Sequence, residues 1–209
     1  MTEPIDDSIE TMNYFLPGMG ATSAMYAGAW RSLPDTTFLE WPSDFTGDSL
    51  RDAAEYFVEN ENISEGDSMI GSSLGGMVAC EIAALVDLNH LVLLGSARNR
   101  EEVSTLLSIL HPLIHVTPID FIQRIAGIVP HDLTQMFEQA DPKFIRTMCK
   151  AIFDWPGLQV EREVFRIHGK KDRVIPLPEN VDLVLDAGHL IALSHDEACV
   201  EALKKQGIL

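Results

Sequence analysis

A serine, an aspartate and a histidine are placed in this sequence where they could together carry out acyl transfer. They are Ser73, Asp172 and His189, in the order nucleophile, acid, base. A serine hydroxyl is a poor nucleophile at neutral pH, so it needs an imidazole to accept its proton and a carboxylate to orient that imidazole. Because the chain offers all three groups, we interpret them as the catalytic residues of an enzyme that works through a covalent serine intermediate.

The serine lies in the segment Gly71-Ser72-Ser73-Leu74-Gly75, between an apolar run that ends at Met69-Ile70 and a helical pattern over 74–86. A strand that turns sharply into a helix exposes the residue at the tip, and glycines on either side let the backbone fold tightly. This context favours a nucleophile elbow with Ser73 at its tip. A phosphate-binding loop is disfavoured, because such a loop ends in Gly-Lys-Ser or Gly-Lys-Thr, whereas Gly75-Gly76-Met77 stands here.

The proposed acid and base each follow a segment typical of a strand. Residues 164–169 predict a buried strand, and Asp172 comes shortly after it. His189 comes seventeen residues later, on a predicted loop after the strand-like residues 181–185. Since the carboxyl ends of parallel strands meet at one edge of a sheet, Ser73, Asp172 and His189 are expected to converge there.

Other residues compete for these two roles. Asp186 is a second candidate for the acid because it is close to His189 in sequence, and His195 is a second candidate for the base. His195 is disfavoured because it stands at the start of the predicted last helix, where Ser194 and Glu197 have the spacing of a capping box. His168, at the end of a predicted strand, is interpreted as structural.

The chain resembles the α/β-hydrolase superfamily, through the elbow, the segment His168-Gly169-x-x-Asp172-x-x-x-Pro176 and the pair Gly188-His189. The resemblance runs from about Asn13 to the C-terminus. It implies a mostly parallel sheet with helices on both faces, a Ser-His-Asp triad and hydrolysis of an ester, thioester or similar bond. The first strand-like run, residues 12–16, already leads into the loop that follows the third strand of that family, so the family's opening hairpin is expected to be missing.

An acyl-transfer site also needs donors for the oxyanion of the intermediate. One is expected to be the backbone N–H of Leu74, the residue after the nucleophile. The second is expected from the loop Pro17-Gly18-Met19-Gly20, and the N–H of Met19 is favoured. The chain departs from the family here, because a His-Gly commonly opens this loop and Leu16-Pro17-Gly18 replaces it.

The alternation of predicted strands and helices indicates one α/β domain over residues 1–209 with parallel strands. Further strands are expected at 36–41 and 90–94, and Asp48 is expected to cap a helix that begins near Leu50. Between about 97 and 157 the alternation stops, and a helical cap is predicted there. Helix starts are expected at Thr117-Pro118 and Asp141-Pro142.

The cap is rich in apolar side chains, some of which could line a substrate pocket. Packing of the cap onto the main domain explains any one of them equally well. The candidates for the pocket wall are Phe121, Ile125, Phe137 and Met148.

No metal or other cofactor is predicted. His111 and His115 have the spacing of two ligands on one helix face, but Pro112 interrupts that face and no Glu lies beside the first histidine. The three cysteines have no close spacing, which argues against a zinc knuckle and against a disulfide framework. A reducing, cytoplasmic setting is expected.

Charge narrows the range of partners. Fifteen basic and 32 acidic residues give a formal net charge of −17, which disfavours binding to nucleic acid or to an anionic membrane. The acidic excess is interpreted as a solvated surface that aids solubility. A small-molecule substrate is the expected partner.

The leading hypothesis is therefore a serine hydrolase that cleaves a small or medium apolar carboxylic ester through an acyl-enzyme on Ser73. A thioesterase is the nearest alternative. Coenzyme-A thioesters are polyanionic, so a chain of this charge would need its basic residues gathered at the pocket mouth. The candidates are Arg98, Arg100, Lys143, Arg146 and Lys150. A second alternative is a ligand sensor on the same fold, in which the triad survives and slow turnover serves signalling.

Overall fold

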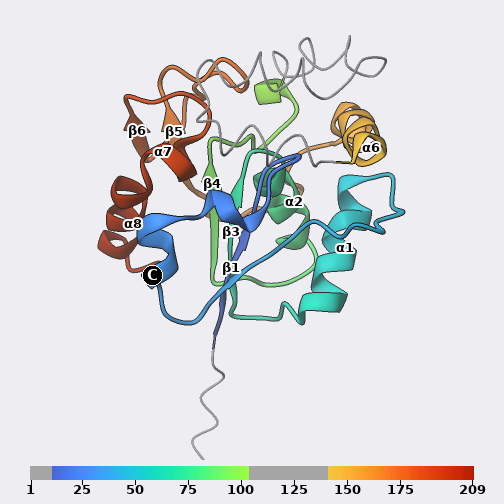
Figure 1. Ribbon diagram of the computed structural model, residues 1–209, viewed down its shortest axis with the longest axis horizontal. Helices are drawn as coiled ribbons and strands as arrows, with labels where there is room; N and C mark the ends of the chain where they lie inside the picture. The colour runs from blue at the N-terminus through green and yellow to red at the C-terminus, as the bar shows by residue number, and fades with distance from the viewer. Residues whose placement is uncertain (1–10, 104–140) are drawn as a thin grey trace, which may run out of the picture.

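The computed structural model describes residues 11–103 and 141–209, which form a sheet with helices on both faces (Figure 1). The sheet has the strand order β2-β1-β3-β4-β5-β6, and every neighbouring pair is parallel. The predicted mostly parallel sheet with helices on both faces is therefore confirmed. The strands are β1 (Asn13–Leu16), β2 (Thr36–Phe38), β3 (Ser68–Ser72), β4 (His90–Leu94), β5 (Phe165–Gly169) and β6 (Leu183–Leu185).

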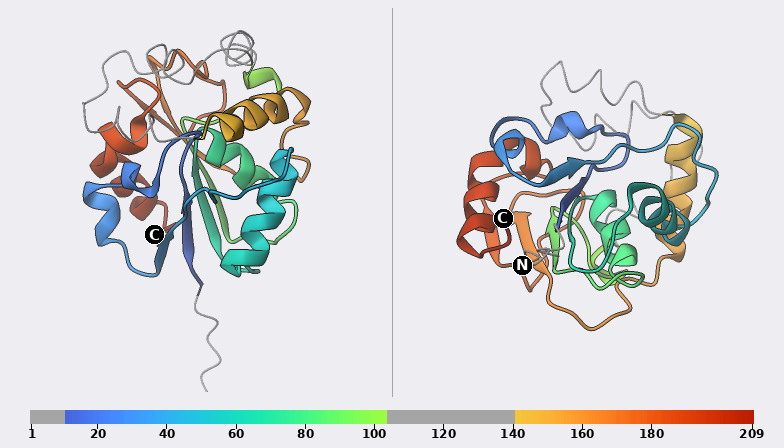
Figure 2. Two further views of the ribbon diagram at one scale, coloured as in Figure 1. Left: turned by 45° about the vertical axis from the view of Figure 1, so that its right-hand side comes forward. Right: turned by 90° about the horizontal axis from the view of Figure 1, so that it is seen from below.

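The helices are divided between the two faces of the sheet (Figure 2). One face is covered by α1 (Leu50–Glu61), α2 (Leu74–Ile82) and α6 (Pro142–Asp154), and the short helix η3 (Glu101–Val103) follows β4. The other face is covered by η1 (Ser23–Met25), η2 (Gly28–Ser32), α7 (Ile191–Ser194) and α8 (Asp196–Lys205). None of the helices in the described ranges is long and apolar enough to span a membrane.

Two hydrophobic cores result from the alternation of side chains along the strands. Tyr14 and Leu16 of β1 belong to the core under α1, α2 and α6, whereas Phe15 between them belongs to the core under η2 and α8. Met69 and Ile70 of β3 divide in the same way. Successive residues of a strand point to opposite faces, so a run that is apolar throughout is buried on both.

The sheet reverses its direction of winding between β1 and β3. The chain passes from β1 outward to β2 on one side, and then returns to β3 on the other side of β1. In open α/β sheets, ligands bind beyond the carboxyl ends of the strands at such a switch point. The loop after β1 and the turn after β3 meet there, and these two segments contain Met19 and Ser73.

The ends of the helices agree only partly with the sequence patterns. Helix α1 is capped by Ser49, not by Asp48 as predicted, because Ser49 accepts from the N–H of Asp52 while the Asp52 carboxylate accepts from the N–H of Ser49. The predicted capping box of Ser194 is also wrong. Ser194 closes the separate helix α7 and donates its hydroxyl to the carbonyl of Leu190 at 2.9 Å, so α8 begins without it.

Helix α6 is the described part of the predicted cap. It begins as expected, with Pro142 in its first turn and Asp141 accepting from two N–H groups. Met148 is fully buried in the core that α6 shares with α1 and α2, which agrees with the packing interpretation of this residue. The other expectations for the cap lie outside the described residues: Phe121, Ile125, Phe137, His111, His115 and the helix start at 117–118.

Candidate active site

The turn between β3 and α2 holds Ser73 in an unusual backbone conformation. Its φ is 51° and its ψ is −120°, a region that a residue with a Cβ rarely adopts. The strained turn is held by hydrogen bonds on both sides. The Ser73 N–H donates to the carbonyl of Leu94 at 3.1 Å, and the Ser73 carbonyl accepts from Gly76 and Met77 at 3.0 and 3.3 Å.

The flanking glycines of the elbow are required by close packing. A Cβ on Gly71 would overlap the backbone of Gly75 and Gly76, and a Cβ on Gly75 would overlap the carbonyl of Leu16. Neither glycine has a positive φ. These positions therefore need glycine for space, and Ser73 carries the strain of the turn itself.

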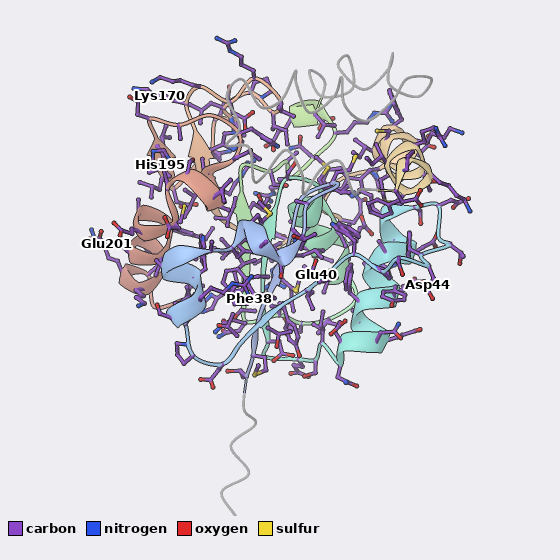
Figure 3. All side chains as sticks on the ribbon, viewed as in Figure 1. Phe38, Glu40, Asp44, Lys170, His195 and Glu201 are labelled. Carbon is purple, nitrogen blue, oxygen red and sulfur yellow. The ribbon has the colours of Figure 1, made fainter. Side chains whose placement is uncertain are left out.

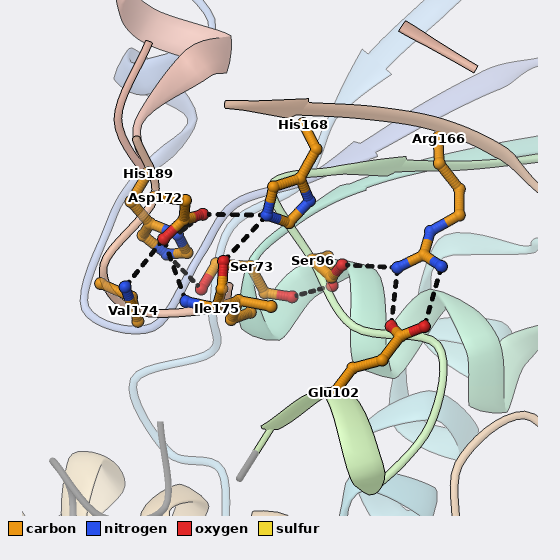
Figure 4. Close-up of polar contacts among 9 residues, drawn as sticks. All are labelled: Ser73, Ser96, Glu102, Arg166, His168, Asp172, Val174, Ile175 and His189. Atoms are coloured by element: carbon orange, nitrogen blue, oxygen red, sulfur yellow. Dashed lines mark hydrogen bonds and ion pairs between the residues drawn. The ribbon is translucent and has the colours of Figure 1, made fainter. Parts of the chain in front are cut away.

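The structure brings Ser73, His189 and Asp172 together (Figure 4). The Nε2 atom of His189 lies 2.9 Å from Ser73 Oγ, and its Nδ1 atom lies 2.8 Å from Asp172 Oδ2. Because Nδ1 faces a carboxylate, it carries the ring proton of neutral His189 and leaves Nε2 free to accept the Ser73 proton. His189 and Asp172 are buried while Ser73 is half-buried, so Ser73 is the most accessible of the three residues.

The carboxylate of Asp172 is surrounded by donors. Its Oδ1 atom accepts from the N–H groups of Val174 at 2.8 Å and Ile175 at 3.0 Å, and its Oδ2 atom faces His189 and His168 Nε2, the latter at 3.3 Å. Burial alone would raise the pKa of Asp172, but the positive charge that His189 carries when it is protonated and the hydrogen bonds from His168, His189 and Ile175 outweigh it and hold this pKa well below its usual range. Asp172 is therefore ionised at neutral pH.

This lowered pKa predicts how Asp172 contributes to stability at different pH. A carboxylate with a lower pKa in the folded state stabilises the fold fully above its ordinary pKa of about 4, and the contribution disappears as the pH falls through the folded-state value. Asp172→Asn should therefore lower the melting temperature more at about pH 7 than at about pH 3. Asp44→Asn, on the exposed surface, controls for the loss of one charge. An equal loss at both pH values would contradict the prediction.

The competing residues lie outside this cluster. The Asp186 carboxylate is exposed and pairs with Lys171 at 2.7 Å and Lys170 at 3.1 Å. His195 Nδ1 lies 2.8 Å from the Ser194 hydroxyl, and Figure 3 shows His195 and Lys170 at the outer edge of the molecule. Neither Asp186 nor His195 shares a hydrogen bond with His189 or Ser73 in the described residues.

The expected oxyanion donors flank Ser73. Leu74 is the first residue of α2, and the N–H groups of a first helical turn have no acceptor within the helix. On the other side, a Cβ built on Gly18 would lie 3.3 Å from Ser73 Cβ, so the loop after β1 runs against Ser73. The side chain of Met19 points to α6, where its sulfur lies 3.9 Å from Cys149 Sγ. The N–H of Met19 remains the favoured second donor.

A buried chain of polar contacts leads from the elbow to the start of the predicted cap, and the sequence analysis missed it. Ser96 Oγ donates to the Ser73 carbonyl at 2.6 Å, and Arg166 of β5 donates to the Ser96 carbonyl at 3.2 Å (Figure 4). Arg166 also forms two hydrogen bonds with Glu102 of η3, at 2.9 and 2.6 Å. An arginine inside an apolar strand is the signal that could have revealed a buried partner.

The fold and this arrangement of residues define an α/β hydrolase, and comparison with known families agrees. The sequence model of the alpha/beta hydrolase family matches residues 14–202, so the chain belongs to this family. No curated protein matches it.

Solved structures share the fold at low sequence identity. An esterase from Thermogutta terrifontis superposes with a TM-score of 0.71 at 15% identity, covering 94% of this chain and 89% of that one. An esterase from Exiguobacterium antarcticum gives 0.70 at 18% identity, with 94% and 91% covered. MenH from S. aureus gives 0.69 at 15% identity, with 95% of each chain covered.

Proposed function

We propose that this protein is a serine hydrolase that cleaves carboxylic esters through an acyl-enzyme on Ser73. The observation that carries the proposal is the hydrogen-bonded series Ser73 Oγ, His189 Nε2, His189 Nδ1 and Asp172 Oδ2, with distances of 2.9 and 2.8 Å. Membership of the alpha/beta hydrolase family supports a hydrolase. The esterases among the structures of the same fold agree with an ester as the substrate.

The proposed reaction has two halves. Ser73 Oγ attacks the ester carbonyl and gives its proton to His189 Nε2, and the N–H groups of Leu74 and Met19 bind the oxyanion that forms. The C–O bond of the ester then breaks, and His189 returns the proton to the leaving alcohol. In the second half, His189 takes a proton from water, the resulting hydroxide attacks the acyl-enzyme, and the acid leaves while Ser73 regains its proton.

A cavity of about 260 Å³ lies beside the loop after β1, where Gly20 belongs to its wall but Ser73 and His189 do not, and we propose that it accepts the acyl group of a small or medium substrate. Its wall contains the aromatic side chains of Trp41, Phe45 and Phe144 and the acidic residues Glu40 and Asp141. Apolar groups can pack on the aromatic rings, whereas the two carboxylates disfavour an anionic group. The wall and the net charge of −17 thus favour an uncharged ester over a polyanionic thioester.

An apolar pocket of limited size predicts a particular dependence on acyl length. Each methylene buried in the pocket contributes up to about 0.8 kcal/mol, or about fourfold in kcat/KM, until the pocket is filled. Hydrolysis of p-nitrophenyl esters should therefore rise with acyl length and then fall. Acyl-coenzyme-A thioesters of the same acyl groups, measured beside them, should be poorer substrates.

Four results would contradict this proposal in different ways. A flat dependence on acyl length, or a preference for charged acyl groups, would argue against an apolar pocket. Faster hydrolysis of the thioesters would favour a thioesterase. A burst of one equivalent of p-nitrophenol followed by very slow turnover would favour a ligand sensor.

A further inference from the structure

The indole of Trp41 holds the loop that faces the nucleophile. Trp41 follows β2, and its Nε1–H donates to two backbone carbonyls, that of Gly18 at 3.1 Å and that of Pro17 at 3.2 Å. Both belong to the loop after β1, which runs against Ser73. No sequence motif marks Trp41, which was expected only to end a strand.

The orientation of one peptide group follows from these contacts. The Gly18 carbonyl is held by Trp41 and also accepts from the N–H of Ala21 at 3.1 Å. No peptide bond in the described ranges is cis, and in a trans peptide the C=O and the N–H point in opposite directions. The two donors on the Gly18 carbonyl therefore fix the direction of the Met19 N–H as well.

We propose that Trp41 is a positioning residue for the oxyanion hole, which aims the Met19 N–H by holding the Gly18 carbonyl from the opposite side. This inference rests on the proposed function, since it assigns Trp41 a part in the same acyl transfer. Oxyanion donors are effective because they are fixed before the charge develops. Without the hydrogen bond from the indole of Trp41, the loop would have to become ordered during the reaction, and this would slow the acyl transfer.

The surroundings of Trp41 fix the ring itself. Its ring packs against Phe57 of α1, with centroids 5.5 Å apart, and against Phe144 of α6, with centroids 5.0 Å apart. Helix α6 also reaches the loop directly, through the contact of Cys149 with Met19. The loop is therefore held between the indole N–H and α6, and a phenylalanine at position 41 would keep an aromatic ring there while removing the donor together with part of the ring system.

The test compares Trp41→Phe with Trp155→Phe. Trp155 is a suitable control because its buried indole also donates one hydrogen bond, to Glu81 Oε1 at 2.8 Å, away from Ser73. We expect Trp41→Phe to lower kcat for p-nitrophenyl esters by about tenfold, less than the loss of an oxyanion donor itself, with KM changed less than about twofold. The control should keep the wild-type kcat at a temperature where both variants are folded.

A transition-state mimic gives a second readout that packing alone would not change. A trifluoromethyl ketone adds to the serine hydroxyl and forms a tetrahedral oxyanion, so its affinity should weaken in Trp41→Phe by about the same factor as kcat/KM. In Trp155→Phe it should stay the same. If Trp41→Phe does not fold, 3-benzothienylalanine at position 41 replaces the indole N–H with sulfur in a ring of nearly the same shape and makes the same comparison.

The outcomes separate this inference from the proposed function. Equal kcat and equal ketone affinity in the two variants would overturn the role of Trp41 while leaving the esterase in place. A rise in KM with an unchanged kcat would also overturn it, since Trp41 would then act only as part of the cavity wall and would not position the oxyanion hole. A wild-type protein that neither hydrolyses esters nor binds the ketone would overturn the proposed function, and this inference with it.

Discussion

Replacing Ser73 with alanine is expected to lower ester hydrolysis by about 10⁴-fold or more, because no other group then attacks the carbonyl. The fold should remain. The Ser73 side chain contributes one hydrogen bond, to His189, whereas the bonds that hold the turn use the Ser73 backbone. Alanine keeps the Cβ and therefore changes neither the space nor the strain at the elbow. Rates with p-nitrophenyl esters and a thermal melt measure the two effects separately.

Ser72→Ala is the matched control, since Ser72 is the adjacent residue and its side chain is buried in β3. It should keep its activity. Labelling with a fluorophosphonate, followed by peptide mass analysis, should modify Ser73 in the wild type and in Ser72→Ala, and should modify nothing in Ser73→Ala. Turnover by Ser73→Ala at the wild-type rate would refute the mechanism. A label on Ser72 would show that Ser72, and not Ser73, is the nucleophile.

Replacing Asp172 with asparagine is the second large effect, with an expected loss of about 10⁴-fold in kcat from the wrong histidine tautomer. Asparagine has nearly the same shape and still accepts from the N–H groups of Val174 and Ile175 through its oxygen. Its NH₂ group then faces His189 Nδ1. Because the amide NH₂ can only donate a hydrogen bond, Nδ1 must accept it and cannot carry the ring proton. His189 must carry its proton on Nε2, and it loses the ability to accept from Ser73.

Asp186→Asn is the control for this variant, because Asp186 is the other aspartate close to His189 in sequence and is bound to two lysines at the surface. Its kcat should equal that of the wild type. A large loss in Asp186→Asn, together with a small one in Asp172→Asn, would transfer the role of the acid. Both rates should be taken near pH 7 and well below the melting temperatures, so that the stability difference does not enter.

The parts of the fold that the sequence predicted best are those decided by local patterns. The parallel strands are marked by apolar runs, and Ser73, Asp172 and His189 each follow a strand in a segment with a characteristic glycine nearby. The residues that support them are decided by distant contacts. Arg166 meets Glu102 across 64 positions, and Trp41 meets the Gly18 carbonyl only because β1 and β2 are neighbours. A single sequence carries no pattern for such pairs.

Helix ends were harder to predict because neighbouring residues can perform the same task. Asp48 and Ser49 are both good capping residues, and the Asp52 carboxylate accepts from the N–H of each, so the cap is decided by the Ser49 hydroxyl, which accepts from the N–H of Asp52. Ser194 has the right spacing for a capping box, but its hydroxyl is used within α7. Met148 shows a related difficulty. Helical spacing indicates that it faces inward, but only the packing of α6 shows that it faces a core.

The backbone conformation of Ser73 lowers the stability of the fold at the residue on which the proposed reaction depends. A residue with a Cβ held at a φ of 51° carries a conformational cost on the order of 1–3 kcal/mol, which glycine would largely avoid. Selection for stability alone would therefore favour glycine at position 73, which would remove the proposed nucleophile. Since a typical domain is stable by only about 5–15 kcal/mol, that cost is a substantial fraction of the total. The proposed reaction, rather than the requirements of folding, therefore accounts for a serine at the tip of the elbow.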